Sequence, residues 1–145
     1  MNPRQLLLSL VLGTLFWLLA ALFVRYFGAY FFAGQTLRLL GLYAASGPLS
    51  WLLFQKPTQW LGSFSPPALY DSVVVMTCIA TLLDGVALTF WQPLYGDSPT
   101  IVLLGAAWIL WGVGCGLGLA YATKTNWQRS AAARARTQYL AQAAA

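Results

Sequence analysis

The feature that most constrains this chain is its first uncharged run, which extends over about 20 residues from Gln5 to Val24. At a rise of about 1.5 Å per residue, a helix of that length crosses the roughly 30 Å hydrocarbon core of a bilayer. The apolar pattern continues past Arg25 until Gly34, so we expect the helix to reach Phe32. The run is longer than the apolar region of a signal peptide, and no small-x-small cleavage site follows it. We therefore interpret it as an uncleaved membrane anchor.

The composition agrees with a chain whose solvent is lipid. Hydrophobic residues make up 59% of the 145 positions and charged residues only 8%, whereas soluble domains carry about 25% charged residues. The acidic residues are Asp71, Asp84 and Asp97, and glutamate is absent. So few charges cannot cover a water-facing surface. The sequence predicts an all-α polytopic membrane protein and excludes an ordinary soluble enzyme.

Three further apolar runs predict three further spans. The second is interrupted by Gly47 and Pro48, where proline removes a backbone donor, so we expect a kink in that helix. The expected spans are about 5–32, 36–54, 70–91 and 100–123. They form a predicted four-transmembrane-helix bundle over residues 1–123. The short connections make helices one and two, and helices three and four, antiparallel neighbours.

Basic residues predict the orientation of the bundle. If both termini lie on one side, that side carries Arg4, Lys56, Lys124, Arg129, Arg134 and Arg136. Only Arg25 and Arg38 lie toward the other side. Because cytoplasmic loops are enriched in Lys and Arg, we expect both termini to be cytoplasmic.

The last segment, residues 124–145, is basic and rich in alanine. We expect a short cytoplasmic tail or an interfacial helix, separate from the fourth span. Its candidate contacts with anionic lipid headgroups are Lys124, Arg129, Arg134 and Arg136. A solvated tail and a docking segment for a partner protein are the alternatives. The high basicity does not indicate a nucleic-acid partner, because no aromatic-basic recognition module is present.

The missing residue types exclude much chemistry. The chain has no histidine, so it offers no imidazole for haem, zinc or acid–base catalysis. Cys78 and Cys115 stand alone, without the spacing of a redox or metal-binding pair. Scattered serines, threonines and one buried carboxylate do not make a catalytic set. We expect no enzymatic activity, no metal and no cofactor.

The position of Asp84 needs an explanation, because this acidic residue lies well inside the third predicted span. An acidic residue at the centre of a membrane helix costs about 2.5–3.5 kcal/mol on insertion scales. Thr77 and Thr81 precede it by seven and three positions and are expected on the same stripe. One hypothesis is a structural ion pair with Arg25 or Arg38, and Arg25 is expected at matching depth. The others are a coupled proton or cation site, or a carboxylate that reaches the interface.

Glycines in the fourth span predict close helix packing. They are Gly105, Gly112, Gly114, Gly116 and Gly118. Gly112 with Gly116, and Gly114 with Gly118, have the G-x-x-x-G spacing that lets helix backbones approach in lipid. Whether this stripe meets a helix of the same chain or of a second subunit stays open.

Two segments carry a resemblance to a known family: LGTLFWLLAALFVRYFGAYFF and MTCIATLLDGVALTFWQPLY. Their shared elements are Arg25, Tyr26 and Gly28 in the first segment, and Leu82, Leu83, Asp84 and Gly85 in the second. Over residues 6–122 the chain resembles a family of small bacterial four-helix integral membrane proteins that has no assigned function. The resemblance implies the cytoplasmic membrane of a bacterium and no particular activity. Small multidrug transporters match in size, but the essential glutamate of their first helix has no counterpart here.

Two functions follow as hypotheses. The first is a non-enzymatic small membrane protein, a structural or accessory subunit that assembles with itself or with a larger membrane complex. The second is a homo-oligomeric proton- or cation-coupled small transporter or channel that uses Asp84, with the kinked second helix as its gate. A dry pair between Asp84 and Arg25 would favour the first, and an accessible Asp84 the second.

Overall fold

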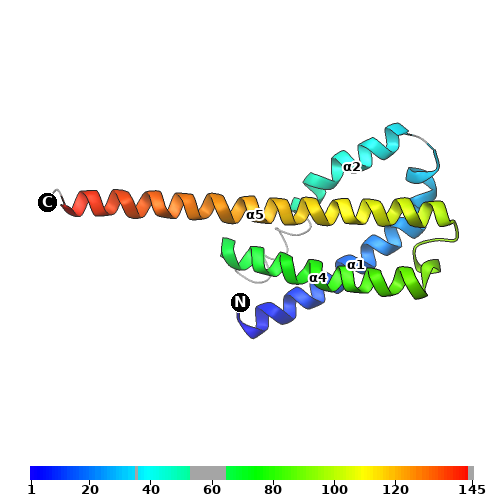
Figure 1. The fold of residues 1–145 in the computed structure, drawn as a ribbon, viewed down its shortest axis with the longest axis horizontal. Coiled ribbons are helices and arrows are strands. Elements are labelled where there is room, and N and C mark those ends of the chain that lie inside the picture. The colour runs from blue at the N-terminus through cyan, green and yellow to red at the C-terminus, as the bar shows by residue number, and fades with distance from the viewer. Residues whose placement is uncertain (35, 53–64, 144–145) are drawn as a thin grey trace.

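The computed structural model describes residues 1–34, 36–52 and 65–143. Within these ranges the protein is all-α, with four helices and one short 3-10 turn. Figure 1 shows α1 (Pro3–Phe32), α2 (Thr36–Ser50), α4 (Pro66–Phe90) and α5 (Pro99–Ala143). Three of them, α1, α4 and α5, are long and apolar enough to cross a membrane. The all-α prediction is confirmed, and these three helices fit a multi-pass membrane protein.

Helix α1 begins and ends where local chemistry requires. Asn2 caps it, because the Asn2 side chain accepts a hydrogen bond from the backbone of Gln5 at 2.8 Å. The Gln5 side chain accepts one in return from the backbone of Asn2 at 3.1 Å, which completes a capping box. Gly34 stops the chain after the helix with a φ of +93°, a region that favours glycine. The expected helix is confirmed, and it starts two residues before the predicted first span.

The α-helical part of α2 ends at Ser50, inside the predicted second span. Its 15 residues extend about 22 Å, whereas a helix that crosses the roughly 30 Å hydrocarbon core needs about 20 residues. Pro48 lies in its last turn, and a π-helical turn follows at 51–52. The break expected in the middle of this span therefore coincides with the end of the α-helix. Residues 53 and 54 of the predicted span lie outside the described residues.

Helix α4 starts at Pro66, four residues before the predicted boundary, because two prolines fit its first turn. It ends at Phe90, and the N–H of Trp91 closes it onto the carbonyl of Ala87 at 2.7 Å. The turn η2 (Gln92–Leu94) and Gly96, with a φ of +144°, lead into α5.

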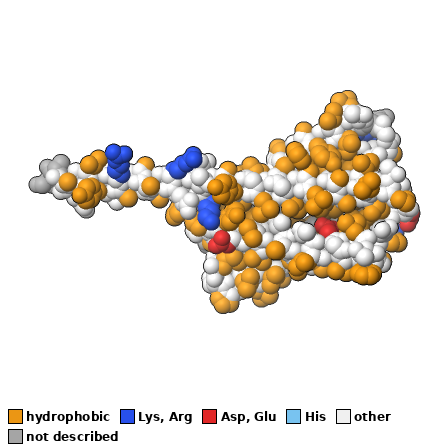
Figure 2. Space-filling model, in the orientation of Figure 1, with side chains coloured by type: hydrophobic (Ala, Val, Ile, Leu, Met, Phe, Trp, Pro, Cys, Tyr) orange, Lys and Arg blue, Asp and Glu red, His pale blue; other side chains and the backbone are white. Residues whose placement is uncertain are grey.

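Helix α5 is continuous over 45 residues, about 67 Å. No helix break marks residue 123, the predicted end of the fourth span, so the tail continues as helix and the end of the span stays a prediction. Residues 124–143, here called the C-terminal extension, continue straight past the other helices (Figure 1). Figure 2 shows hydrophobic side chains over the bundle, and Lys and Arg along the extension and beside it. An interfacial helix would have to turn at the bilayer surface, and α5 does not turn.

The chain ends lie on the same side of the bundle. Figure 1 places the N-terminus and the C-terminal extension at one end, and the α1–α2 and α4–α5 connections at the opposite end. The predicted antiparallel arrangement of α4 and α5 follows from this placement. The most extensive helix contact, however, joins α1 to α4, a pairing that the loop lengths do not indicate.

Close backbone approaches and one polar contact hold α1 in place. A Cβ on Gly13 would lie 2.8 Å from the backbone of Met76 in α4. One turn away, the buried hydroxyls of Ser9 and Ser72 form a 2.7 Å hydrogen bond between the same two helices. On the α5 side, Gly105 contacts Val24 so closely that a Cβ there would overlap the valine side chain.

Candidate functional site

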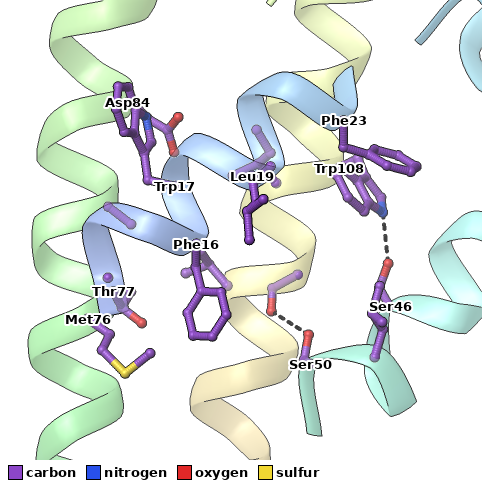
Figure 3. A pocket seen from close by; sticks show the side chains of 17 residues that line it. Phe16, Trp17, Leu19, Phe23, Ser46, Ser50, Met76, Thr77, Asp84 and Trp108 are labelled. Carbon is purple, nitrogen blue, oxygen red and sulfur yellow. Dashed lines mark hydrogen bonds between the residues drawn. The ribbon is translucent and has the colours of Figure 1, made fainter. Parts of the chain in front are cut away.

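A cavity of about 260 Å³ lies between the four helices and is lined by residues of all of them. Its walls are mostly apolar, and four aromatic side chains contribute to them: Phe16, Trp17, Phe23 and Trp108. The polar side chains that line it are Ser46, Ser50, Thr77 and Asp84. Figure 3 shows Asp84 and Thr77 on α4 at one side of this space, with Ser46 and Ser50 on α2 at the other. The single carboxylate therefore faces an apolar, aromatic-walled space.

Asp84 is bound by a tyrosine that sequence reasoning missed. Its carboxylate accepts a hydrogen bond from the hydroxyl of Tyr95, in the connection after α4. The same hydroxyl accepts a hydrogen bond from the indole N–H of Trp17 in α1 at 3.1 Å. Tyr95 is completely buried. Burial is the main cause that raises the pKa of Tyr95, and the neighbouring Asp84 carboxylate is the second. The phenol therefore stays protonated and donates the hydrogen bond to Asp84.

No sequence pattern pointed to Tyr95. Tyrosines near the ends of membrane helices are enriched at the membrane interface, so the position of Tyr95 alone indicates an interfacial residue. The sequence of the turn after α4 does not indicate that Tyr95 folds back into the bundle. The only available hint was the position of Tyr95, eleven residues after Asp84 and just before the glycine that bends the chain.

The predicted ion pair between Asp84 and Arg25 is wrong. Arg25 donates instead to the backbone carbonyl of Pro93 in η2. Arg38 donates to the carbonyl of Tyr30 at 3.4 Å and lies 4.2 Å from the centre of its ring. Across residues 1–34, 36–52 and 65–143, no basic side chain pairs with Asp84. Matching depth was not enough, because the side chain of Arg25 is exposed while Asp84 faces the cavity.

The predicted polar stripe on α4 is correct in part. Thr77 and Asp84 both line the cavity, together with Ala80. Thr81 is exposed and does not line it. Positions 77, 80 and 84 follow the i, i+3, i+7 pattern of one helix face, and position 81 lies at the edge of that face.

On the opposite wall, side chains tie α2 to α5. The indole N–H of Trp108 donates to the hydroxyl of Ser46 at 2.8 Å, and the hydroxyl of Ser50 donates to the carbonyl of Gly112 at 3.2 Å. The ring of Trp108 also packs against Phe23 of α1, with ring centres 4.9 Å apart. These contacts fix one aromatic wall of the cavity.

The glycine stripe of α5 does not act as a single packing face. Gly105 is buried against Val24, and Gly116 is also buried. For Gly112, Gly114 and Gly118, an added Cβ would meet nothing within 4 Å. These three glycines therefore show no close packing within the described fold, and their packing against a second subunit stays a prediction. Gly112 instead lines the cavity.

The basic candidates for lipid headgroups are spread along α5. The ammonium of Lys124 lies 4.3 Å from the centre of the Tyr70 ring, beside the bundle. Arg129, Arg134 and Arg136 are exposed on the C-terminal extension. Arg136 is twelve residues past Lys124, about 18 Å along the helix axis. Binding to headgroups stays a prediction.

The donor set of the site does not suit a resident metal ion. In the part of the chain that the structure describes, no three His, Cys, Asp or Glu side chains come together. Asp84 is the single carboxylate at the cavity. The site places one carboxylate among aromatic rings and hydroxyl groups.

Fold and site together define a helical protein with three candidate membrane-crossing helices. Its four helices surround an apolar cavity that a few polar side chains also line. Comparison with protein-family models, with curated proteins and with solved structures finds no match to this chain. The resemblance to small bacterial four-helix membrane proteins therefore stays a prediction.

Proposed function

We propose that this chain is a small, non-enzymatic membrane transporter in which Asp84 couples transport to a bound proton or cation. The observation that carries the proposal is the exposure of Asp84 to an interhelical cavity without a basic partner in the described structure. A charged aspartate at this depth is costly. A proton or a cation that enters the cavity neutralises the carboxylate and removes that cost. The charge at Asp84 then depends on whether a proton or a cation is bound.

The unequal attachment of the helices supports a moving part. Helices α1 and α4 meet through backbone, at Gly13 and Met76. Helix α2 is held to α5 by side-chain hydrogen bonds, such as those of Ser46 and Ser50. Since side-chain hydrogen bonds within membranes contribute only about 0.6 kcal/mol on average, α2 is the helix that moves at least cost. It is our candidate for the gate.

We place the protein in the cytoplasmic membrane of a bacterium, as a homo-oligomer with both termini in the cytoplasm. The common end of the N-terminus and the C-terminal extension supports this orientation. Arg4 and the four basic residues from Lys124 onward belong to that end, in agreement with the enrichment of Lys and Arg in cytoplasmic segments.

The test is flux through reconstituted protein. Proteoliposomes are given a membrane potential, and the fluxes of protons, of sodium and potassium ions, and of small organic ammonium ions are recorded. We expect at least one flux that Asp84→Asn abolishes. Asp71→Asn is the matched control, because Asp71 lies on the same helix, is exposed and does not line the cavity. Vesicles as tight as protein-free ones to every ion would contradict the proposal.

One observation favours a second function, an accessory subunit of a larger membrane assembly. The C-terminal extension exposes Trp127, Tyr139 and Leu140, at 40%, 71% and 57% of their surface, beyond the bundle. Large apolar side chains in water often mark a contact with another protein. Native mass spectrometry of protein extracted in mild detergent tests this, since a stoichiometric larger partner should be lost when the extension is removed.

A further inference from the structure

The size of the cavity limits what it can hold. An engineered cavity of about 150 Å³ binds benzene, and pockets for drug-sized ligands start at roughly 300 Å³. At about 260 Å³, this cavity suits a compact molecule larger than benzene and smaller than a typical drug.

The chemistry of the walls limits its charge. Asp84 contributes the one carboxylate, and the Tyr95 hydroxyl is the donor that faces it. Among the residues that the structure describes, no Lys or Arg lines the cavity. Phe16, Trp17, Phe23 and Trp108 surround the space with aromatic rings (Figure 3). Ring faces attract cations, most strongly where water is excluded, and a carboxylate supplies the compensating charge. The site therefore matches a monovalent cation.

The same walls disfavour an inorganic ion. Hard cations such as calcium take six to eight oxygen ligands, and magnesium needs near-octahedral oxygen geometry. Here one carboxylate faces apolar walls, and the Ser46 and Ser50 hydroxyls already engage Trp108 and Gly112. An organic cation needs no such shell, because its own alkyl or aryl groups contact the apolar walls.

The rim of the cavity offers a route from the bilayer. Helices α1 and α2 make few contacts with each other. Leu19 of α1 and Leu49 of α2 line the cavity and are still 51% and 43% exposed. In a membrane, this exposure faces lipid or a neighbouring subunit, so a lipophilic molecule reaches the site laterally.

We propose that this cavity binds a small lipophilic organic cation, a substituted ammonium about the size of benzyltrimethylammonium, with Asp84 as its counter-charge and the aromatic side chains as its cage. The proposal rests on the transport function above and names the class of its substrate.

The test is equilibrium binding of radiolabelled benzyltrimethylammonium to the full-length protein in lipid nanodiscs. We expect saturable binding that neopentylbenzene, the uncharged compound of the same shape, displaces poorly. Asp84→Asn should weaken the affinity about tenfold or more, because the amide keeps an acceptor for Tyr95 but removes the charge. Asp84→Glu should keep most of the affinity, and Asp71→Asn all of it.

A second variant keeps the proposal testable if Asp84→Asn does not fold. Gly112→Leu fills the cavity from α5, where a Cβ meets nothing within 4 Å. Gly114→Leu is its matched control on the same helix, because that glycine is equally open and does not line the cavity. We expect Gly112→Leu to abolish binding and Gly114→Leu to leave it intact.

Several results would overturn the proposal: no saturable binding to the wild type, wild-type affinity in folded Asp84→Asn or in Gly112→Leu, or equal displacement by the uncharged compound. Failure of transport is separate from failure of binding. Binding without any flux would refute the transporter and leave the site, whereas an Asp84-dependent proton flux without binding would refute the organic cation alone.

Discussion

The α1–α4 contact and the α2–α5 contact use similar residues to opposite effect. Between α1 and α4, Gly13 brings backbone against backbone, and Ser9 bonds to Ser72 in a fully buried contact. Between α2 and α5, Gly47 and Gly112 have nothing within 4 Å of an added Cβ, and side chains bridge the helices instead. Glycine thus permits close approach in one place and leaves space in the other.

This difference explains where the cavity lies. Helices that meet through backbone leave little volume between them. Helices α1 and α2 make few contacts with each other, and the cavity lies in the space that these two helices enclose with α4 and α5. The tight contact positions Asp84 and Thr77 of α4 against α1. The loose contact supplies the opening and the aromatic wall that includes Trp108.

The largest effect that would test this comparison is a substitution in the tight contact. Gly13→Leu forces a side chain into the backbone of Met76, and overpacking of a close helix contact costs about 1–3 kcal/mol or more. We expect little monodisperse protein in size-exclusion chromatography. Gly114→Leu, on the open side, should elute as the wild type does. Equal profiles for the two variants would mean that the two contacts do not differ.

The next effect concerns the connection that joins the two regions. Tyr95→Phe removes the donor to the Asp84 carboxylate and the acceptor for Trp17. Loss of a hydrogen bond to a charged group costs about 1.5–3 kcal/mol. We expect the free energy of unfolding in sodium dodecyl sulfate to fall by about this amount. Tyr43→Phe is the control, since its hydroxyl takes no part in the Asp84 network, and a similar loss there would argue against a special role for Tyr95.

A smaller effect separates the polar contacts on the two sides. Ser9 and Ser72 should show a coupling of about 0.6 kcal/mol in a double-mutant cycle, the average for interhelical hydrogen bonds in membranes. The matching double-mutant cycle on the α2 side combines Ser46→Ala with Trp108→Phe and measures the coupling between these two side chains. If α2 is the moving helix, its coupling should be the smaller of the two, and the reverse order would remove α2 as the gate.

The smallest effect is expected outside both contacts. Removal of residues 126–145 takes away most of the C-terminal extension, whose described residues are mostly exposed. The free energy of unfolding should change by less than about 0.5 kcal/mol, as for surface changes in general. A large loss of stability would show that the extension contributes to the bundle.

The candidate site shows how far sequence reasoning reached. The sequence singles out Asp84 because a carboxylate in an apolar run is costly wherever the run folds, and the structure shows that it lines the cavity. Thr77 shares its face by helical spacing alone. Tyr95 was missed, and Arg25 was wrongly assigned, because both depend on how the connection after α4 folds back. That connection follows no periodic pattern, so nothing local predicts the direction of its side chains.

The apolar runs alone establish that this chain forms long helices suited to lipid, and that Asp84 lies inside one of them, since both follow from short-range periodicity and composition. The neighbours of each helix face are decided by tertiary structure. The same kind of glycine is packed at position 13 and open at position 112, and the same kind of carboxylate takes a tyrosine in place of an arginine. Contacts between helices depend on rotation and tilt about axes that the sequence pattern does not encode.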